Sequence, residues 1–535
     1  MPTPNAALAD IQLADILLAG KWQPSASSKT FESLDPSTGQ PLPHAFPISN
    51  WADCEIALDA AVAAAEQLRQ LRPSQIADFL DAFAAELEAH SDSLCAVAHS
   101  ESALPLKPRL ADVELPRTAG QLRQAAQAAR SGSWAQAVID TKLGIRSCYE
   151  ALGPVCVFGP NNFPFAFNSV SGGDFAAAIA AGNPVIAKAN SSHPATTKLL
   201  AELALAAVQK TGLPAATVQM IYRTSHEDGS RLVADPRVGA IGYTGSRQAG
   251  LVLKAAADAV GKPIYLELSS INPVVILPGA LAERGAEIAD EFATSGLMGT
   301  GQFCTNPGLV LLVKGADSQQ FIDSVTAKFE AAPAGTLLSA GVQKSLTEAI
   351  KKISAAGANL LCGGQAVSGR CSVSNTLLQV SAEKFLAAPD DFQTEAFGNA
   401  ALLVVADSVD QVALVLRALE GNLTGCIYSD KQGSDDAAYQ QLAPLLAQRV
   451  GRLLNDKMPT GVAVSPAMNH GGPFPATGHP GFTAVGIPAS LFRFAKLTCY
   501  DAVRPGRLPK LLQDKNPTGQ TWRCIDLNWT TDDVS

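Results

Sequence analysis

Between Gly153 and Leu268, short apolar runs alternate with alanine-rich stretches long enough to form helices. Most of the predicted helices end near a turn that contains glycine or proline. This alternation predicts a parallel, doubly wound sheet, which binds ligands at the carboxyl ends of its strands. The predicted strands are 155–159, 184–188, 217–222, 238–242 and 264–268, and the predicted helices are 165–181, 195–210, 226–234 and 247–260.

A second α/β region is predicted from about Ile271 to Lys496. A helix precedes Cys304, and a further helix is expected at 319–330. The total of 535 residues is too long for one compact core, so two or three domains are expected. The apolar strands predicted in this region are 309–314, 400–406 and 425–429.

Composition and charge argue against several classes of binding partner and indicate a cellular location. The net charge is −9 with no block of basic residues, which argues against binding nucleic acid or an anionic membrane. No apolar stretch is long enough to span a bilayer, and residues 1–20 lack the lysine or arginine of a secretory signal. The ten cysteines show no CxxC or Cys/His ligand spacing, so we expect reduced thiols, no metal site and a cytoplasmic location.

Three residues at predicted strand or helix ends could carry chemistry. Cys304 follows Gly-Thr-Gly-Gln-Phe, whose small residues would let a substrate approach its sulfur. Glu267 ends an apolar strand, where burial favours a general base, and the amide of Asn162 could donate to an oxyanion. Taken singly, each has a plainer interpretation: a core cysteine, a salt-bridged strand end and a turn asparagine.

Together with other motifs, these residues resemble the aldehyde dehydrogenase superfamily in order and spacing. The resemblance covers nearly the whole chain and implies a Rossmann-like cofactor domain (1–132 and 151–270). It also implies a catalytic thiol domain (271–496) and a small β oligomerisation arm with a C-terminal tail (133–150 and 497–535). The matching motifs are Asn-Phe-Pro at 162–164, Lys188, Gly-Tyr-Thr-Gly-Ser at 242–246, Glu-Leu at 267–268, Gly-Gln-Phe-Cys at 301–304 and Glu-Ala-Phe-Gly at 395–398.

The resemblance implies a role for each of the three residues. Cys304 would attack the aldehyde, and Asn162 with the Cys304 backbone N–H would hold the oxyanion. After hydride leaves for the nicotinamide, a thioester would remain on the sulfur. Glu267 would activate water to hydrolyse it, whereas relatives that transfer the acyl group to coenzyme A typically lack glutamate there.

The same resemblance implies a dinucleotide site. Lys188 would reach the adenosine ribose, where Ser191 replaces the glutamate of many NAD-preferring relatives; this favours NADP over NAD. Arg223 is a further candidate for the phosphate or adenine pocket, with a solvated loop arginine as the alternative. The remaining cofactor-binding candidates are Gly245 and Ser246 at the pyrophosphate and Glu395 and Phe397 at the nicotinamide ribose.

Within the superfamily, the sequence is most similar to the α-ketoglutaric semialdehyde (2,5-dioxovalerate) dehydrogenases, especially in Pro-Ala-Met-Asn-His-Gly-Gly-Pro-Phe-Pro-Ala-Thr at 466–477. Arg117, one helical turn from Gln121, is a candidate clamp for the substrate carboxylate, with a surface ion pair to Glu114 as the alternative. The resemblance assigns no role in substrate binding to Asn469 or His470. Further candidates for the tunnel wall are Phe163, Phe167 and Met298.

Two alternatives to this substrate remain. The subgroup is also similar to NADP-linked fatty aldehyde dehydrogenases, and a catalytically idle binding protein would retain the fold alone. Whether the enzyme acts on the semialdehyde or on a fatty aldehyde, its binding partner is a small-molecule aldehyde. The arm predicts pairing with a second copy, as a homodimer or homotetramer.

Overall fold

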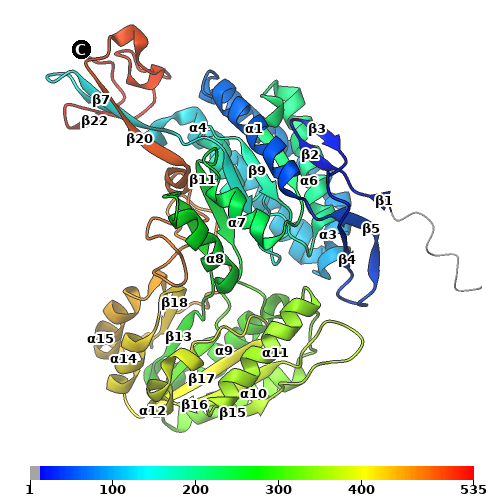
Figure 1. The fold of residues 1–535 in the computed structure, drawn as a ribbon. Coiled ribbons are helices and arrows are strands. Elements are labelled where there is room, and N and C mark those ends of the chain that lie inside the picture. Colours follow the sequence, from blue (N-terminus) through cyan, green and yellow to red (C-terminus); the bar gives the residue numbers. More distant parts are fainter. Residues whose placement is uncertain (1–11) are drawn as a thin grey trace, which may run out of the picture.

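The computed structural model describes residues 12–535, which form two lobes and a projecting arm (Figure 1). Each lobe is built on a seven-stranded sheet, and the arm on a five-stranded one. The α/β class predicted from the sequence is confirmed by these sheets and the helices around them. Within the described residues, no helix combines the length and apolar character needed to cross a bilayer.

The sheet of the first lobe has the strand order β12-β11-β8-β9-β10-β2-β3. The five strands from β12 to β10 are parallel to one another, and β2 joins antiparallel. All five predicted strands are present, each within about two residues of its expected ends. The strands are β2 (Ile16–Leu18), β3 (Lys21–Gln23), β8 (Val155–Phe158), β9 (Val185–Lys188), β10 (Val218–Ile221), β11 (Ala240–Thr244) and β12 (Ile264–Glu267).

Helices pack against this sheet around the largest apolar core of the molecule. Three of the four predicted helices match, but the helix expected at 165–181 occupies only its second half. Residues 165–172 form turns instead, because Glu114 accepts hydrogen bonds from the backbone N–H groups of Phe165 and Ala166. The helices are α1 (Trp51–Leu68), α2 (Pro73–Ala89), α3 (Ser91–Ser102), α4 (Leu115–Ser131), α5 (Gly173–Ala180), α6 (Pro194–Thr211), α7 (His226–Ala234) and α8 (Arg247–Asp258).

The second lobe carries the sheet β15-β16-β17-β14-β13-β18-β19, in which only β15 runs antiparallel to its neighbour. The predicted strands at 309–314, 400–406 and 425–429 correspond to β14, β17 and β18. The strands are β13 (Pro273–Ile276), β14 (Leu309–Val313), β15 (Asn359–Cys362), β16 (Thr376–Ser381), β17 (Ala400–Ala406), β18 (Asn422–Tyr428) and β19 (Val450–Asn455). The helices are α9 (Pro278–Leu297), α10 (Ala316–Ala331), α11 (Ala340–Ala355), α12 (Ala382–Ala387), α13 (Pro389–Phe392), α14 (Val409–Ala418) and α15 (Asp436–Ala447).

The arm is formed by two segments that are far apart in the sequence. Its sheet, in the order β20-β7-β6-β21-β22, combines residues near 138–151 with residues from 495 onward. A separate three-stranded sheet near the N-terminus has the order β1-β5-β4. The arm strands are β6 (Val138–Asp140), β7 (Ile145–Ala151), β20 (Ala495–Asp501), β21 (Arg523–Ile525) and β22 (Asn528–Thr530), and the N-terminal strands are β1 (Gln12–Leu13), β4 (Thr30–Leu34) and β5 (Pro41–Pro47).

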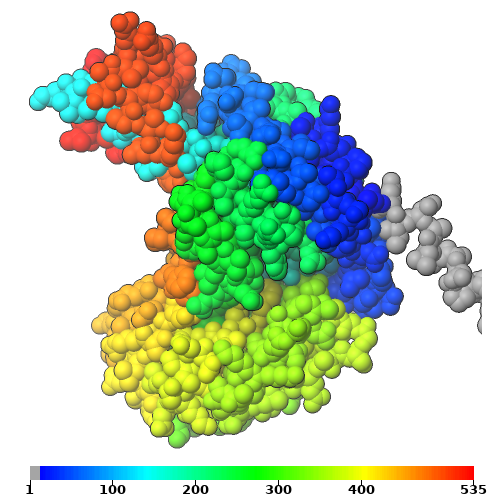
Figure 2. Space-filling model, viewed as in Figure 1, coloured from blue at the N-terminus to red at the C-terminus, as the bar shows by residue number. Residues whose placement is uncertain are grey.

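After β19 the chain returns from the second lobe to the first, along the waist between them (Figure 2). This return segment, residues 456–494, pairs with the first lobe at an isolated bridge between Thr477 and Glu267. Near its end, Arg493 in the short helix η5 (Ala489–Phe494) forms a buried ion pair with Asp174 of α5, with 2.6 Å between Nη1 and Oδ1. The segment therefore lies against the carboxyl end of β12.

Candidate active site

Three loops bring the predicted catalytic residues to the junction of the lobes. Glu267 is the last residue of β12, and Asn162 lies in the loop after β8. Cys304 follows the short helix η4 (Met298–Gly301), in a turn that Asn272 fixes by donating from Nδ2 to the Cys304 carbonyl oxygen at 2.9 Å. Parallel strands present their carboxyl ends at one edge, which explains the convergence of residues from β8 and β12.

Gly301 allows the cysteine turn to approach the loop that carries Glu395. Its φ is 66°, in the left-handed region that favours glycine. A Cβ atom there would lie 2.1 Å from the carbonyl oxygen of Gly398. The close backbone contact holds the cysteine turn against the Glu395–Gly398 segment.

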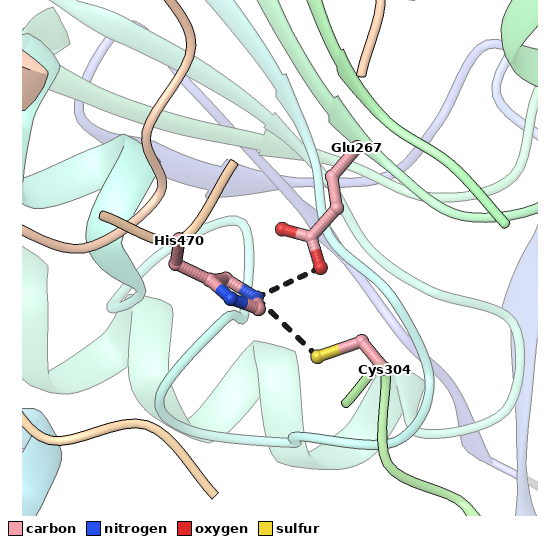
Figure 3. A group of neighbouring side chains, drawn as sticks. All are labelled: Glu267, Cys304 and His470. Carbon is pink, nitrogen blue, oxygen red and sulfur yellow. Dashed lines mark hydrogen bonds and ion pairs between the residues drawn. The ribbon is translucent and has the colours of Figure 1, made fainter. Parts of the chain in front are cut away.

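His470, from the return segment, lies between Glu267 and Cys304 (Figure 3). Its Nε2 is 3.3 Å from the Cys304 Sγ and 3.0 Å from the Glu267 Oε1. The His470 backbone N–H donates to the Thr483 Oγ1 at 3.0 Å, and its ring packs against Phe167 with 5.6 Å between ring centroids. The histidine is thus fixed in place, and one nitrogen faces both other residues.

The charge and burial around Cys304 and Glu267 determine whether Cys304 rests as a thiol or as a thiolate. Burial raises the pKa of the Cys304 thiol well above its usual value, and the nearby negative charge of Glu267 raises it further. Glu267 is 2% exposed, and its Oε2 has no hydrogen-bond partner within residues 12–535. The cysteine therefore rests as a thiol and needs a base, while one carboxylate oxygen stays available for water or substrate.

Asn162 is held beside the cysteine turn by a network that the motifs do not reveal. Its Nδ2 donates to the Gln302 carbonyl oxygen at 3.1 Å, and Arg109 donates from Nη2 to the Asn162 carbonyl oxygen at 3.0 Å. Arg109 also pairs with the buried Glu114 and lies 4.4 Å above the Phe163 ring centroid. Arg109 and Glu114 are five residues apart and not at the i, i+3 or i, i+4 spacing of helix ion pairs, so their sequence gives no signal of this role.

The predicted carboxylate clamp is partly buried above two of the predicted tunnel residues. Arg117 donates from Nε to the Gln121 Oε1 at 3.2 Å, and its guanidinium lies 5.7 and 5.3 Å from the ring centroids of Phe163 and Phe167. Its Nη2 is buried without a partner, and burial lowers its pKa. The alternative ion pair with Glu114 does not form, because that carboxylate binds Arg109.

The other tunnel candidates are placed differently. Gln121 is buried and donates from Nε2 to the Ala166 carbonyl oxygen at 3.1 Å. Phe163 and Phe167 belong to an apolar cluster with Phe303. Met298 lies outside this cluster, and its side chain is 45% exposed.

Glu395 lies between two cavities at the junction of the lobes. One is lined by Phe303, Glu395 and Phe397 among others, and its space, including the part that is open to solvent, is about 440 Å³. The other, of about 250 Å³, extends past Glu395 to Arg247 and Glu420, which form an ion pair of 2.9 Å between the lobes. Burial raises the pKa of Glu395 to about 7, although the Ser270 N–H donates to its Oε1.

The remaining cofactor candidates fit an anionic dinucleotide. Gly245 lies immediately after β11, and its N–H donates a hydrogen bond to the Glu267 carbonyl oxygen at 3.1 Å. Ser246 caps the N-terminus of α8. Lys188 ends β9, and its pKa is lowered to about 8, first by burial and then by the positive charge of Arg223. Ser191, three residues later, is partly exposed. Two cations that repel each other in the free protein would be stabilised by a bound phosphate.

The chain matches known proteins over most of its length. Residues 22–465 match the model of the aldehyde dehydrogenase family. The chain is 41% identical to α-ketoglutaric semialdehyde dehydrogenase 2 of Azospirillum brasilense, over 95% of this chain and 98% of that protein. It is 36% identical to an α-ketoglutaric semialdehyde dehydrogenase of Acinetobacter baylyi, over 92% of this chain and 94% of that protein.

A likeness to solved structures supports the fold. The crystal structure of γ-glutamyl-γ-aminobutyraldehyde dehydrogenase from Burkholderia cenocepacia superposes with a TM-score of 0.77 at 21% identity, covering 92% of this chain and 97% of that one. The aldehyde dehydrogenase fold implied by the sequence is confirmed. The chain therefore belongs to the aldehyde dehydrogenase family and is an oxidoreductase that acts on aldehydes with NAD(P).

Proposed function

We propose that the protein oxidises 2,5-dioxopentanoate (α-ketoglutaric semialdehyde) to 2-oxoglutarate through a thioester on Cys304. The observation that carries this substrate is Arg117, whose Nη2 is buried without a partner. Arg117 is close enough to Cys304 for a thiolate there to raise its pKa. A buried, unpaired guanidinium nitrogen is unfavourable unless a ligand supplies an acceptor, and a carboxylate is its best match. The names of the two similar dehydrogenases agree with this substrate.

The first step is addition of the Cys304 sulfur to the aldehyde carbon. His470 Nε2 takes the thiol proton, and the carboxylate of Glu267 at 3.0 Å stabilises the imidazolium that forms. The sulfur bonds to the carbonyl carbon, and the C=O electron pair moves to oxygen. The Asn162 amide and the Cys304 backbone N–H donate to this oxyanion.

The second step leaves the acyl group on sulfur and then releases it. When bound, the nicotinamide accepts the hydride of the tetrahedral carbon, as it does throughout such oxidations. Glu267 then takes a proton from water through Oε2, and the resulting hydroxide attacks the thioester carbonyl. The carboxylic acid leaves, the sulfur recovers a proton from His470, and Glu267 releases the proton of the water to solvent.

We propose NADP as the preferred dinucleotide. Lys188 and Arg223 would hold the 2′-phosphate, and Ser191 offers a donor where a carboxylate would repel it. Ser246 at the start of α8 would face the pyrophosphate with Gly245, and Glu395 with Phe397 would hold the nicotinamide ribose beside the larger cavity.

We further propose a cytoplasmic homodimer or homotetramer. All ten cysteines are free thiols, as expected in a reducing compartment. The arm projects from the first lobe and exposes large apolar side chains, which supports pairing with another copy. Those side chains include Leu143, Leu497, Trp522, Leu527 and Trp529.

The test compares 2,5-dioxopentanoate with a medium-chain aliphatic aldehyde, each with NADP and with NAD, by following absorbance of the reduced nucleotide. We expect a strong preference for the oxo acid in the wild type and no turnover in Cys304→Ala. In Arg117→Met, kcat/KM for the oxo acid should fall about 10- to 150-fold, which corresponds to a lost hydrogen bond to a charged group. The aliphatic aldehyde should be affected much less.

Arg123 provides a matched control on the same helix. It is exposed and forms a surface ion pair with Glu88 at 2.6 Å, so Arg123→Met should leave both activities unchanged. Preference of the wild type for the aliphatic aldehyde would retain the Cys304 chemistry but refute the carboxylate clamp. Absence of Cys304-dependent turnover with both aldehydes would refute the proposed substrate altogether.

A further inference from the structure

The Cys304 sulfur and the two side chains beside it form a set of three donors that is unusual for a site without a metal. The thiol of Cys304, the imidazole of His470 and the carboxylate of Glu267 each offer one ligand atom, and these atoms all lie within 4.8 Å of one another. Cysteine, histidine and glutamate are the residues that bind Zn²⁺ in proteins. The absence of metal-ligand spacing in the sequence does not exclude this set, because its members come from three separate segments.

Two of the three donor–donor distances are close to those of a tetrahedral zinc site, and the third is within 4.8 Å. With Zn–S near 2.3 Å and Zn–N or Zn–O near 2.1 Å, neighbouring donors are separated by about 3.4–3.6 Å. The Sγ–Nε2 distance is 3.3 Å and the Nε2–Oε1 distance is 3.0 Å. Small side-chain rotations would therefore open the cluster around an ion, while one histidine nitrogen keeps facing both neighbours (Figure 3).

A second observation points to a ligand at this place. Glu267 is 2% exposed, yet its Oε2 has no hydrogen-bond partner among the described residues. A buried carboxylate oxygen without a partner is unfavourable, and a cation would remove that penalty. The ligand charges would also balance, because a thiolate and a carboxylate together offset the two positive charges of the ion.

We propose that Cys304, His470 and Glu267 bind Zn²⁺ and that the bound ion reversibly blocks aldehyde oxidation. Binding displaces the Cys304 thiol proton to solvent and forms a sulfur–zinc bond, so the sulfur pair is no longer free to attack a carbonyl carbon. Three protein ligands leave the fourth position to water, as in open zinc sites. The blocking half of this proposal rests on the proposed role of Cys304 as the nucleophile, whereas the binding half does not.

Metal binding is measured on the full chain without substrate or dinucleotide. Zinc affinity is obtained by competition with a chromophoric chelator, and Co²⁺ is used as a spectroscopic probe of the same site. We expect one tight site per chain and, with Co²⁺, a thiolate-to-metal charge-transfer band together with the intense visible bands of tetrahedral coordination. Loss of an outer-shell partner already lowers metal affinity about 10- to 100-fold, so loss of a ligand in Cys304→Ser or His470→Asn should lower it about 100-fold or more.

Cys499→Ser is the matched control, because this thiol is exposed and lies in the arm. It should bind zinc like the wild type, and melting curves of all variants check that the fold is retained. Wild-type affinity in either Cys304→Ser or His470→Asn would overturn the proposal, as would a wild type that shows no tight site.

Inhibition is measured separately with a substrate that the wild type oxidises. Zinc should abolish turnover of the wild type and of Cys499→Ser at one equivalent, and a chelator should restore it. Tight binding at Cys304 without inhibition would overturn the blocking half. Failure of the enzyme to oxidise 2,5-dioxopentanoate would count against the proposed substrate alone, since zinc binding is scored without any aldehyde.

Discussion

At the scale of single residues, the motifs singled out Cys304, Glu267 and Asn162, which the structure brings to the junction of the lobes, but not the histidine that lies between two of them. Cys304 and Glu267 lie in segments whose composition is restricted by close backbone approach and strand ends. His470 is separated by 166 residues from Cys304 and by 203 from Glu267, so local sequence contains no trace of the contact. The only sequence feature that marked His470 is the segment 466–477, whose similarity to one subgroup of dehydrogenases indicates the subgroup but no role for the histidine.

Arg109 illustrates the same limit of local sequence. Its guanidinium reaches the carbonyl oxygen of Asn162, while its carboxylate partner Glu114 also holds the turn that begins at Phe165. One buried ion pair thus shapes the loop that follows β8. A helix prediction for 165–181 could not anticipate this, because the competing hydrogen bonds come from elsewhere in the chain.

Lys188 yields a pH prediction at this scale. Its pKa in the free protein is about 8, so its positive charge is present below pH 8 and is lost as the pH rises through that value. The charged fraction falls about tenfold between pH 7 and pH 9. The KM for NADP should therefore rise severalfold over this interval, and the KM for NAD should rise less.

Steady-state kinetics with each dinucleotide, at saturating aldehyde, would check this. Lys188→Gln should show a high KM for NADP that varies little between pH 7 and pH 9. An equal pH dependence for NAD and NADP, or one that persists in Lys188→Gln, would contradict the assignment of Lys188 to the 2′-phosphate.

At the scale of elements, the parallel pairing of the central strands followed from the alternation of apolar runs and helices, since each parallel strand needs a crossover. The packing of the return segment could not be predicted in this way. Residues 456–494 contain little regular structure, and their position depends on single contacts such as the bridge between Thr477 and Glu267. Gly173 belongs to the same interface, where a Cβ atom would lie 2.2 Å from the Ala484 carbonyl oxygen.

The buried pair of Arg493 and Asp174 gives a stability prediction for this interface. Arg493 is 1% exposed, so removing it leaves a carboxylate without its cationic partner in the interior. Arg493→Met should lower the free energy of unfolding by about 3–5 kcal/mol. Urea denaturation followed by fluorescence would measure it, with Arg123→Met as the surface comparison expected to change by less than about 1 kcal/mol. An equally small effect for Arg493→Met would show that the pair does not stabilise the interface.

At the scale of the whole molecule, the arm is the feature that a single chain leaves unexplained. Leu497 on β20 is 61% exposed, and β20 is an edge strand of the arm sheet. Leu497→Asp should weaken assembly, because a charge would then face the partner's apolar surface. Light scattering during gel filtration should show a smaller species than the wild type.

Ile56, on α1 of the first lobe, is 45% exposed and serves as the comparison. Ile56→Asp should leave the mass unchanged. A wild type that runs as a monomer, or a Leu497→Asp variant of wild-type mass, would refute assembly through this edge.

Glu267, Cys304 and His470 come from three distant segments, and this has a consequence during synthesis. Glu267 and Cys304 leave the ribosome long before His470, and the ion pair that anchors the return segment needs Arg493. The sulfur therefore has no histidine beside it until most of the second lobe has been translated. The contact between the Cys304 sulfur and His470 Nε2 can form only when residues 456–494 fold back across the waist.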